Sequence, residues 1–381
     1  MSESTAESRL GSVSRDLLDF GDSYAWYLLA GFGLLLALPA LPALLGAFGL
    51  VGSGVAAMGL QGGFYMTLLV EMLVFAVLAL SWDLVGGQTG YPSFGNMAFF
   101  GVGAYTAAIL WKDVGVTLPA AVLVAGPVAA AFAVVVGLAV LRLRGHYFAI
   151  GTLGVLLAAQ QFSRYLDITG GSSGKVLLGA PPEPFFYAFY VGLLVAEVAV
   201  VLYLSKTRFG LVLNAIRDDE RKATAMGVNT TYYKTAAWTV AALFTGFAGG
   251  AFGVFSTFVD PRIAWNLSWN VELIAMALIG GTGTVAGPII GAFGLHFLIV
   301  QIETLFTGYQ LMVLGAVVIV TVVVFPDGVV GTLRERASAM RYYEFGGGSQ
   351  AAETDGGTDA PDAAAGTDPD DGPHATDGGA P

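Results

Sequence analysis

Six ionisable side chains fall inside long apolar stretches of this 381-residue sequence. They are Glu71, His146, Glu197, Glu272, His296 and Glu303. A charge in the centre of a hydrocarbon layer costs about 2.5 kcal/mol or more, so such side chains are expected to face protein or water. Glu197, His146 and Glu303 lie near the ends of their stretches, where snorkelling accounts for them. Glu71 and Glu272 lie deeper, and a proton-coupled carboxylate is the functional reading that they allow.

The sequence lacks the motifs that would make the chain an enzyme. It has no P-loop, no zinc-ligand spacing and no nucleophile elbow. It also has no cysteine, and none of its three histidines pairs with another at metal-ligand spacing. We therefore expect a chain that is not an enzyme and that binds no metal and no cofactor of its own.

Two glycine-rich segments resist a plain lipid-facing interpretation. They are residues 86–105, GGQTGYPSFGNMAFFGVGAY, and residues 280–291, GGTGTVAGPIIG. Glycine allows a helix to break, which exposes carbonyl groups and amide ends to a zwitterionic ligand. It also allows two helices to pack closely, and for any single glycine this alternative is equally good.

The rest of the sequence consists mainly of apolar stretches. Hydrophobic residues make up 55% of the chain and charged residues only 12%, whereas a soluble domain is usually about 25% charged. Stretches of roughly 20 apolar residues recur, each long enough to cross a membrane as a helix. We predict spans near 24–46, 64–82, 93–111, 118–141, 146–163, 186–204, 235–256, 271–283, 287–305 and 310–325. The predicted fold is thus an all-α, polytopic integral membrane protein with about ten transmembrane helices, of which the short ones can be re-entrant.

Charge divides the chain into a membrane domain and two tails. Residues 1–23 are a polar N-terminal tail, residues 24–335 the membrane domain, and residues 336–381 an acidic tail that lacks the apolar residues to fold and is predicted to be disordered. With ten spans and an inside N-terminus, 13 of the 17 basic residues lie on the inner side, as the positive-inside rule requires. We therefore predict a multi-pass protein with both termini in the cytoplasm.

The longest basic loop, residues 205–234, has a helical pattern on the predicted inner side. Apolar residues recur at Leu213, Ile216, Ala223 and Met226, and Gly227 stands where a helix would end. Residues 229–231 are a candidate cap for the next helix. A short amphipathic helix at this place can dock into a groove of a cytoplasmic partner. The alternative is a solvated loop that simply obeys the positive-inside rule.

Four ordered blocks resemble a known family, the permeases of branched-chain amino acid ABC importers, and within it the M-type subunit of the Liv system. The blocks are LALSWDLVGGQTGYPSFGNMAFFGVGAYTAAIL (78–110), LRGHYFAIGTL (143–153) with the TGGS run at 169–172, FGLVLNAIRDDERKATAMGVN (209–229) and VELIAMALIGGTGTVAGPIIGA (271–292). In the third block the coupling motif of ABC permeases expects Glu-Ala-Ala, whereas Arg221, Lys222 and Ala223 stand there.

The resemblance implies a heteromeric importer in the cytoplasmic membrane. Its partners would be a related H-type permease, cytoplasmic ATP-binding subunits that use the ATP, an extracellular solute-binding protein and membrane lipids, with no nucleic acid. The cargo would be leucine, isoleucine or valine. Permeases for urea, amides or other amino acids share much of the pattern, and an ion-coupled secondary transporter using Glu71 or Glu272, or a structural membrane protein, are the alternatives from other classes.

Two sets of site residues follow. The substrate pathway is predicted beside Gly90, Ser93, Phe94, Gly95, Tyr105, Thr169, Gly170 and Gly171. The ATPase-coupling loop is predicted to act through Leu213, Ile216, Arg217, Ala223, Met226 and Gly227, with the apolar side chains as anchors and the charges at a solvated rim.

Overall fold

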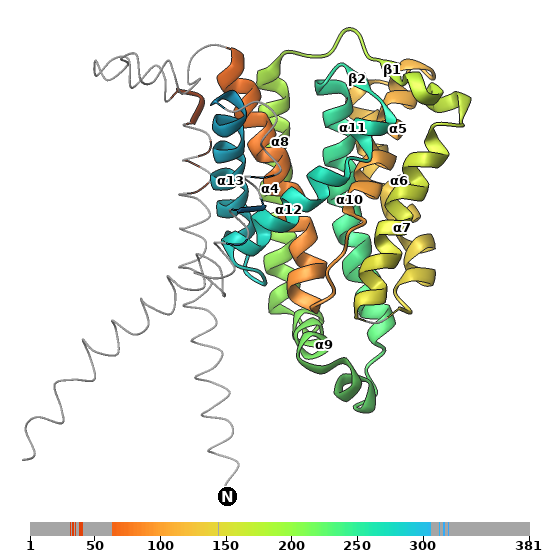
Figure 1. Ribbon diagram of the computed structural model, residues 1–381, viewed down its shortest axis with the longest axis vertical. Helices are drawn as coiled ribbons and strands as arrows, with labels where there is room; N and C mark the ends of the chain where they lie inside the picture. The colour runs from red at the N-terminus through yellow and green to blue at the C-terminus, as the bar shows by residue number, and fades with distance from the viewer. Residues whose placement is uncertain are drawn as a thin grey trace, which may run out of the picture. The chain divides into compact units, whose positions relative to one another are not determined.

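The computed structural model describes residues 63–143 and 145–305, together with residues 31, 33, 35, 38–40, 312, 315, 316 and 319. Within these residues the protein is a bundle of apolar helices (Figure 1). The helices are α4 (Gly63–Thr89), α5 (Asn96–Lys112), α6 (Leu118–Val140), α7 (His146–Ser163), α8 (Glu183–Lys206), α9 (Arg208–Ala225), α10 (Thr230–Phe255), α11 (Pro261–Ala264), α12 (Leu267–Gly280) and α13 (Ala286–Leu305). Three short 3₁₀ turns lie at Leu38–Ala40 (η1), Asp167–Thr169 (η2) and Gly171–Ser173 (η3).

The predicted all-α membrane fold is confirmed. In the described part of the chain, five stretches are long and apolar enough to cross a membrane: Phe64–Thr89, Leu118–Val140, Glu183–Lys206, Thr230–Phe255 and Pro261–Gly280. The shorter helices α5, α7 and α13 fall where spans were predicted. The predicted spans at 24–46 and 310–325 lie largely outside the described residues, as do both predicted tails.

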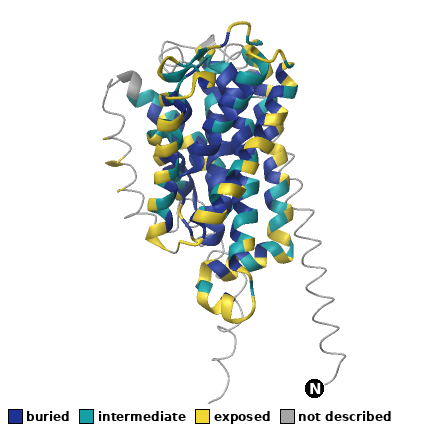
Figure 2. Cartoon of the chain, turned by 90° about the vertical axis from the view of Figure 1, so that its right-hand side faces the viewer, coloured by how far each residue is buried: buried dark blue, intermediate teal, exposed yellow. Residues whose placement is uncertain are grey.

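The bundle is organised around α4 and α10. The apolar stretch of α4 is 94% buried, whereas those of α6 and α8 are only 39% and 44% buried. In Figure 2 buried residues, in dark blue, fill the middle of the bundle and exposed ones, in yellow, lie on its outer surface. Helix α10 packs against α5, α6, α4 and α8. Its contact with α5 is close because a Cβ at Gly103 would overlap the carbonyl oxygen of Gly246, and a Cβ at Gly249 would overlap that of Phe100. Small residues therefore set the central helix spacing.

A two-stranded sheet lies at the end of the bundle opposite α9 (Figure 1). Strands β1 (Lys175–Val176) and β2 (Phe258–Val259) pair antiparallel, with Lys175 opposite Val259. Lys175 also forms an ion pair with Asp113, just after the end of α5. Figure 1 shows the strands at the top of the bundle and α9 at the bottom. This places the two ends of α5 at opposite ends of the molecule.

The first glycine-rich segment, residues 86–105, is mostly helical. Helix α4 continues to Thr89 instead of ending near residue 82, and α5 begins at Asn96 instead of residue 93. Only the six residues between the two helices, 90–95, are free of helix and strand. Gly87 is helical, and a Cβ at this position would overlap the Asp83 carboxylate and the backbone nitrogen of Gly283. At this position glycine serves packing, the alternative that the sequence left open.

Candidate functional site: the junction of α9 with the bundle

Two side chains cap the two halves of helix α9. The Thr207 side chain accepts a hydrogen bond from the backbone N–H of Phe209, 3.3 Å away, and starts the helix. At Asp219 the backbone leaves the helical region, with φ −163° and ψ 103°. The Asp219 carboxylate accepts from the N–H groups of Arg221 and Lys222 and so caps the second half. Helix α9 is thus two short helices joined at a kink.

The predicted end of this helix and the next cap are confirmed. Gly227 has a φ of +87°, the left-handed conformation that glycine adopts without steric cost. Asn229 accepts from the N–H of Tyr232 at 3.1 Å and caps α10. The chain therefore makes a tight turn out of α9 and directly into the bundle.

The apolar side chains of α9 do not all face outward as expected. Leu213, Ile216 and Ala223 are buried inside this chain, where α9 packs on α4, α8 and α10. The expectation that these three side chains are free to anchor a partner is wrong, because the bundle itself buries that stripe of the helix. On α9 and at the residue that follows it, the exposed large apolar side chains are Leu211, 67% exposed, and Met226, 85% exposed.

A buried ion pair fastens α9 to the bundle. Lys234 Nζ at the start of α10 lies 2.6 Å from Glu220 Oε1 of α9, and the Lys234 side chain is only 2% exposed. Lys234 also lies over the Tyr91 ring, 4.2 Å from its centroid, and the Tyr91 hydroxyl donates to Glu220. Burial alone would raise the pKa of Glu220, but hydrogen bonds from Lys234, Tyr91 and Thr230 lower it below its ordinary value. Glu220 is therefore held as a carboxylate.

A second contact joins α9 to α4 and to the other glycine-rich turn. The Asp83 carboxylate, 1% exposed, accepts from the N–H of Gly283 at 2.8 and 3.1 Å. Arg217 of α9 reaches the same turn: its Nη1 lies 2.5 Å from where a Cβ of Gly283 would stand, and its charge acts on Asp83. Arg217 also packs on Gly90, whose φ is +72°. Both glycine-rich segments thus meet at Arg217.

We call this set the inner junction: Asp83, Gly90, Tyr91, Arg217, Glu220, Lys234 and Gly283. The loop that carries Gly90 and Tyr91 is itself fixed to two helices. The Trp82 indole donates to the Ser93 carbonyl at 2.8 Å, and the Phe94 N–H donates to Thr152 Oγ1 of α7 at 2.9 Å. The loop between α4 and α5 therefore contacts α4, α7 and α9.

The predicted pathway residues fall into separated groups. Gly90, Ser93, Phe94 and Gly95 lie at the α9 end of α5, with Ser93 fully buried. Thr169 lies near the other end, buried, with its hydroxyl 2.6 Å from the carbonyl oxygens of Ser163 and Leu166. Gly170 and Gly171, with φ of +80° and +59°, form the turn after it. Helix α5 has 17 residues and so separates the groups by about 25 Å.

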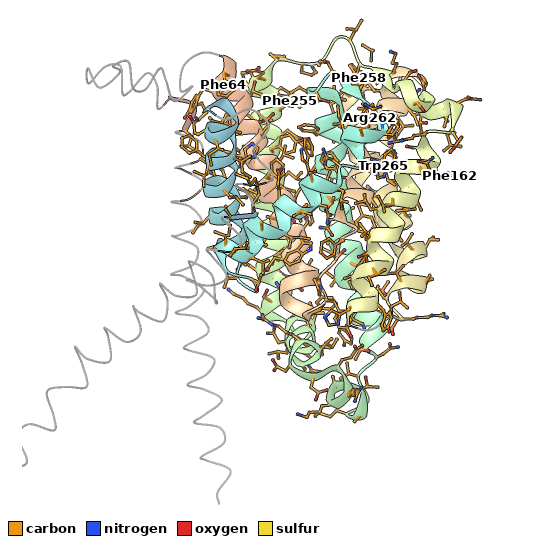
Figure 3. All side chains as sticks on the ribbon, in the orientation of Figure 1. Phe64, Phe162, Phe255, Phe258, Arg262 and Trp265 are labelled. Atoms are coloured by element: carbon orange, nitrogen blue, oxygen red, sulfur yellow. The ribbon has the colours of Figure 1, made fainter. Side chains whose placement is uncertain are left out.

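These residues do not line one site, although a route along α5 would pass both groups. Tyr105 lies between them, buried, and stacks on Trp265 with ring centroids 4.9 Å apart. Figure 3 labels Trp265 on the stretch between α11 and α12. The side chains that connect the groups therefore come from α5 and from residues 265–270.

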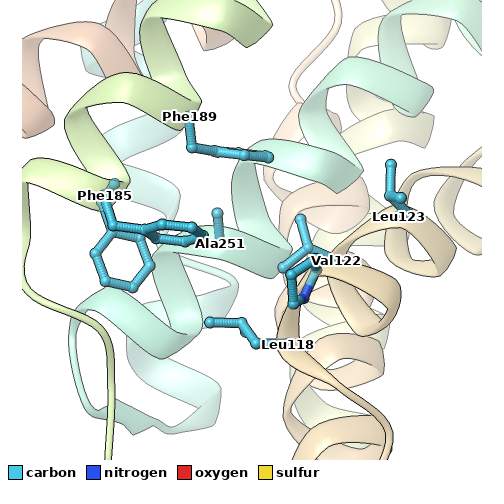
Figure 4. Close-up of a pocket in the computed structure, with 8 residues that line it drawn as sticks. Leu118, Val122, Leu123, Phe185, Phe189 and Ala251 are labelled. Carbon is cyan, nitrogen blue, oxygen red and sulfur yellow. The ribbon is translucent and has the colours of Figure 1, made fainter.

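A pocket of about 240 Å³ opens elsewhere, between α6, α8 and α10 (Figure 4). Its lining is Leu118, Pro119, Val122, Leu123, Phe185, Phe186, Phe189 and Ala251. Such side chains cannot orient an ammonium or a carboxylate, so this pocket is suited to hydrocarbon. Among residues 63–143 and 145–305, no cluster of potential metal ligands occurs.

The intramembrane acids have partners that spacing alone did not reveal. Glu71 lies 3.4 Å from His296 Nε2, a residue 225 positions away. Glu197 is 1% exposed and accepts from Ser81 at 2.5 Å, so the expected snorkelling of Glu197 is wrong. The Glu303 side chain lies outside the described residues. His146 is exposed at the start of α7.

Sequence patterns alone did not single out four residues of the inner junction: Asp83, Tyr91, Glu220 and Lys234. Asp83 was overlooked because the span was ended at residue 82, although a lone acid in an apolar helix is a usable signal. Glu220 and Lys234 looked like ordinary charges of a basic loop. Their burial depends on Tyr91, which lies 129 residues from Glu220.

Apolar helices of membrane-spanning length, with an amphipathic helix packed on one end of their bundle, define a polytopic membrane protein. The chain belongs to the family described as branched-chain amino acid transport system / permease component, whose model matches residues 64–322.

Similar proteins agree with this membership. The high-affinity branched-chain amino acid transport system permease protein LivM of Salmonella typhimurium is 27% identical over 296 residues, which cover 69% of each chain. The LivH protein of the same transport system and organism is 21% identical over 68% of this chain and 91% of its own. The autoinducer 2 import system permease protein LsrC of Yersinia enterocolitica is 28% identical over 43% of this chain and 46% of its own. No solved structure matches.

Proposed function

We propose that this chain is an M-type permease subunit of an ABC importer and carries leucine, isoleucine or valine across the cytoplasmic membrane. It works beside a related H-type permease, with separate ATP-binding subunits in the cytoplasm and a solute-binding protein outside. Its family membership and its similarity to LivM support the cargo. Its similarity to both LivM and LivH, two permease proteins of one transport system, supports a paired permease.

The observation that carries the proposal is the construction of α9. The helix lies between two spans, exposes Met226 and Leu211, and is fastened from behind by the Glu220–Lys234 ion pair. A helix that receives force from a motor needs an exposed contact and a rigid attachment. We therefore place the ATPase contact on Leu211, on Met226 and on the half of α9 that follows the kink at Asp219.

The orientation follows from the same assignment. An ATPase contact on α9 requires that the end of the bundle with α9 faces the cytoplasm, where 13 of the 17 basic residues lie when both termini are inside. External protease acting on intact cells should leave a C-terminal tag uncleaved. Cleavage of that tag would overturn this topology.

The experiment that tests the function is reconstitution of this permease with its candidate partners. The complex should co-purify with an ATPase, and proteoliposomes should take up leucine only with internal ATP and external binding protein. Uptake driven by a proton or sodium gradient without ATP would instead favour the ion-coupled alternative, with Glu71 as the first carboxylate to test. Uptake of urea or of amides in preference to leucine would reassign the cargo.

Surface variants test the proposed ATPase contact. Met226→Asp and Leu211→Asp should each reduce co-purification of the ATPase, because a charge replaces an apolar anchor in a desolvated contact. Leu178→Asp is the matched control, since Leu178 is 82% exposed near the opposite end of the bundle. Lys222→Ala, at an exposed charge, should be nearly silent. Equal effects of Met226→Asp and Leu178→Asp would remove α9 from the contact.

A further inference from the structure

One seam of the bundle contains buried hydrogen-bond donors that no described residue satisfies. It runs along α5, between this helix and residues 265–270. Asn270 Nδ2, Trp265 Nε1 and the Tyr105 hydroxyl are all buried and have no hydrogen-bond partner within the described part of the protein. We call these three groups the donor ladder. Buried side-chain groups without partners are few in native proteins, so three along one seam call for an explanation.

The three groups are spaced regularly along α5. Asn270 Oδ1 accepts from the backbone N–H of Met97 at 3.3 Å, which leaves its Nδ2 unused. The Trp265 indole lies on the backbone of Gly101, where a Cβ would overlap its Nε1. Tyr105 stacks on the same indole at an interplanar angle of 19°. Positions 97, 101 and 105 lie on one face of the helix, one turn or about 6 Å apart.

The chemistry of the ladder is one-sided. The indole N–H and the amide nitrogen of asparagine can only donate, and the tyrosine hydroxyl can donate. A fourth unpartnered donor among the described residues, Asn96 Nδ2, lies in the first turn of α5. The group that matches such a set is rich in acceptors and carries no donors of its own. A carboxylate fits, because it accepts through two oxygens and gains from each neutral donor.

The absence of charge on these three donors also suits transport better than tight binding. An arginine or lysine at this place would hold a carboxylate strongly. Neutral donors at successive turns bind it weakly and at several positions, which lets a permeating group enter and leave. The ladder also spans α5 between the two groups of predicted pathway residues, near Ser93 at one end and Thr169 at the other.

We infer that Asn270, Trp265 and Tyr105 bind the carboxylate of the transported amino acid in succession as it passes along α5. This rests on the proposed function and names the part of the cargo that the seam recognises. Because Trp265 is 4% exposed and Asn270 is fully buried, the described conformation is closed around the seam. Gln160 of α7 holds this closed form, donating to the carbonyl oxygens of Pro261 and Trp265 at 3.1 and 3.2 Å.

Removal of single donors tests the inference. Trp265→Phe removes the indole N–H and keeps an aromatic ring, and Tyr105→Phe removes only the hydroxyl. The matched control is Trp238→Phe, because Trp238 is 1% exposed and its Nε1 is likewise without a partner in the described chain, yet it packs on Phe99 and Phe148 away from the ladder. All three variants delete an unsatisfied polar group, so none should lower the thermal stability of the complex through a lost hydrogen bond.

The readout is uptake of radiolabelled leucine by proteoliposomes that contain the full complex, with ATP hydrolysis measured in parallel. We expect Trp265→Phe to reduce uptake about tenfold, as for loss of one hydrogen bond to a charged group, while ATP hydrolysis is retained. Tyr105→Phe should reduce uptake in the same direction, and Trp238→Phe should stay at the wild-type level. Uptake by Trp265→Phe and Tyr105→Phe equal to that of Trp238→Phe would overturn the inference alone. Wild-type complex that takes up no leucine would overturn the proposed function, and the inference with it.

Discussion

The inner junction and the donor ladder use polar groups in opposite ways. At the inner junction Glu220 is paired with Lys234 and Tyr91, and Asp83 with the N–H of Gly283. Along the ladder, Asn270, Trp265 and Tyr105 keep donors that no described residue accepts. Satisfied networks make a structure rigid, whereas unsatisfied groups are retained at a cost in stability where a ligand uses them. Under the proposed function, the inner junction transmits movement and the donor ladder meets the cargo.

The largest effect should come from breaking the ion pair on one side. Glu220→Gln leaves the Lys234 ammonium buried without a counter-charge, which costs about 3–5 kcal/mol. We expect little folded complex, measured as the yield of monodisperse protein in detergent. The double variant Glu220→Leu with Lys234→Met should recover the yield, since it removes both buried charges. A normal yield of the single variant would mean that water reaches Lys234 and that the pair is not structural.

The close contact between α5 and α10 should be almost as sensitive to substitution. Gly249→Ala places a methyl group on the Phe100 carbonyl oxygen of α5, and overpacking of this kind costs about 1–3 kcal/mol. Gly154→Ala is the control, because a Cβ there meets nothing within 4 Å. Thermal unfolding of the two variants should differ clearly, with Gly154→Ala at or above the wild-type value. Equal midpoints would show that α5 and α10 separate without cost.

Asp83 allows a finer distinction within the inner junction. Asp83→Asn keeps an acceptor for the N–H of Gly283 but loses the charge that faces Arg217, whereas Asp83→Ala loses both. We expect Asp83→Ala to be the less stable by about 1 kcal/mol, the usual worth of one hydrogen bond. Both should weaken the link between ATP hydrolysis and uptake. If Asp83→Asn retained wild-type coupling, the charge of Arg217 would have no role in transmission.

The smallest expected effect is on thermal stability at acidic pH. The pKa of Glu220 is lowered from its ordinary value of 4.5, so the folded state favours the carboxylate. Its contribution to stability is therefore complete above pH 4.5 and is lost as the pH falls through the lower, folded-state pKa. Thermal midpoints should stay level from neutral pH down to that point and then decline. The double variant at Glu220 and Lys234 should lack this part of the decline.

The helices themselves could be predicted because apolar length and caps are local features. The spans from α4 to α13, the end of α9 near Gly227 and the Asn229 cap all follow from residues within one or two turns. The direction in which α9 buries its apolar stripe could not be predicted. Periodicity indicates that Leu213 and Ile216 lie on one face of the helix and that this face is buried. It does not indicate whether the bundle or a partner covers that face.

The site residues were harder for the same reason. Gly90 and Gly283 are far apart in sequence and meet only through Arg217, and Glu71 meets His296 across 225 residues. The glycine patterns indicated that something approaches closely, yet packing and ligand access leave the same signature in a sequence. At Gly103 and Gly249 the neighbour is another helix, and at Gly101 it is the indole of Trp265.

Under the proposed function, the ion pair between α9 and α10 carries movement from an ATPase to the bundle. The most direct test compares leucine uptake with ATP hydrolysis in the reconstituted complex containing Glu220→Leu with Lys234→Met. Because the double variant keeps the exposed face of α9, it should still support ATP hydrolysis, while uptake per ATP hydrolysed falls about tenfold, as for loss of roughly 1.4 kcal/mol of coupling. An unchanged ratio of uptake to hydrolysis would contradict the claim.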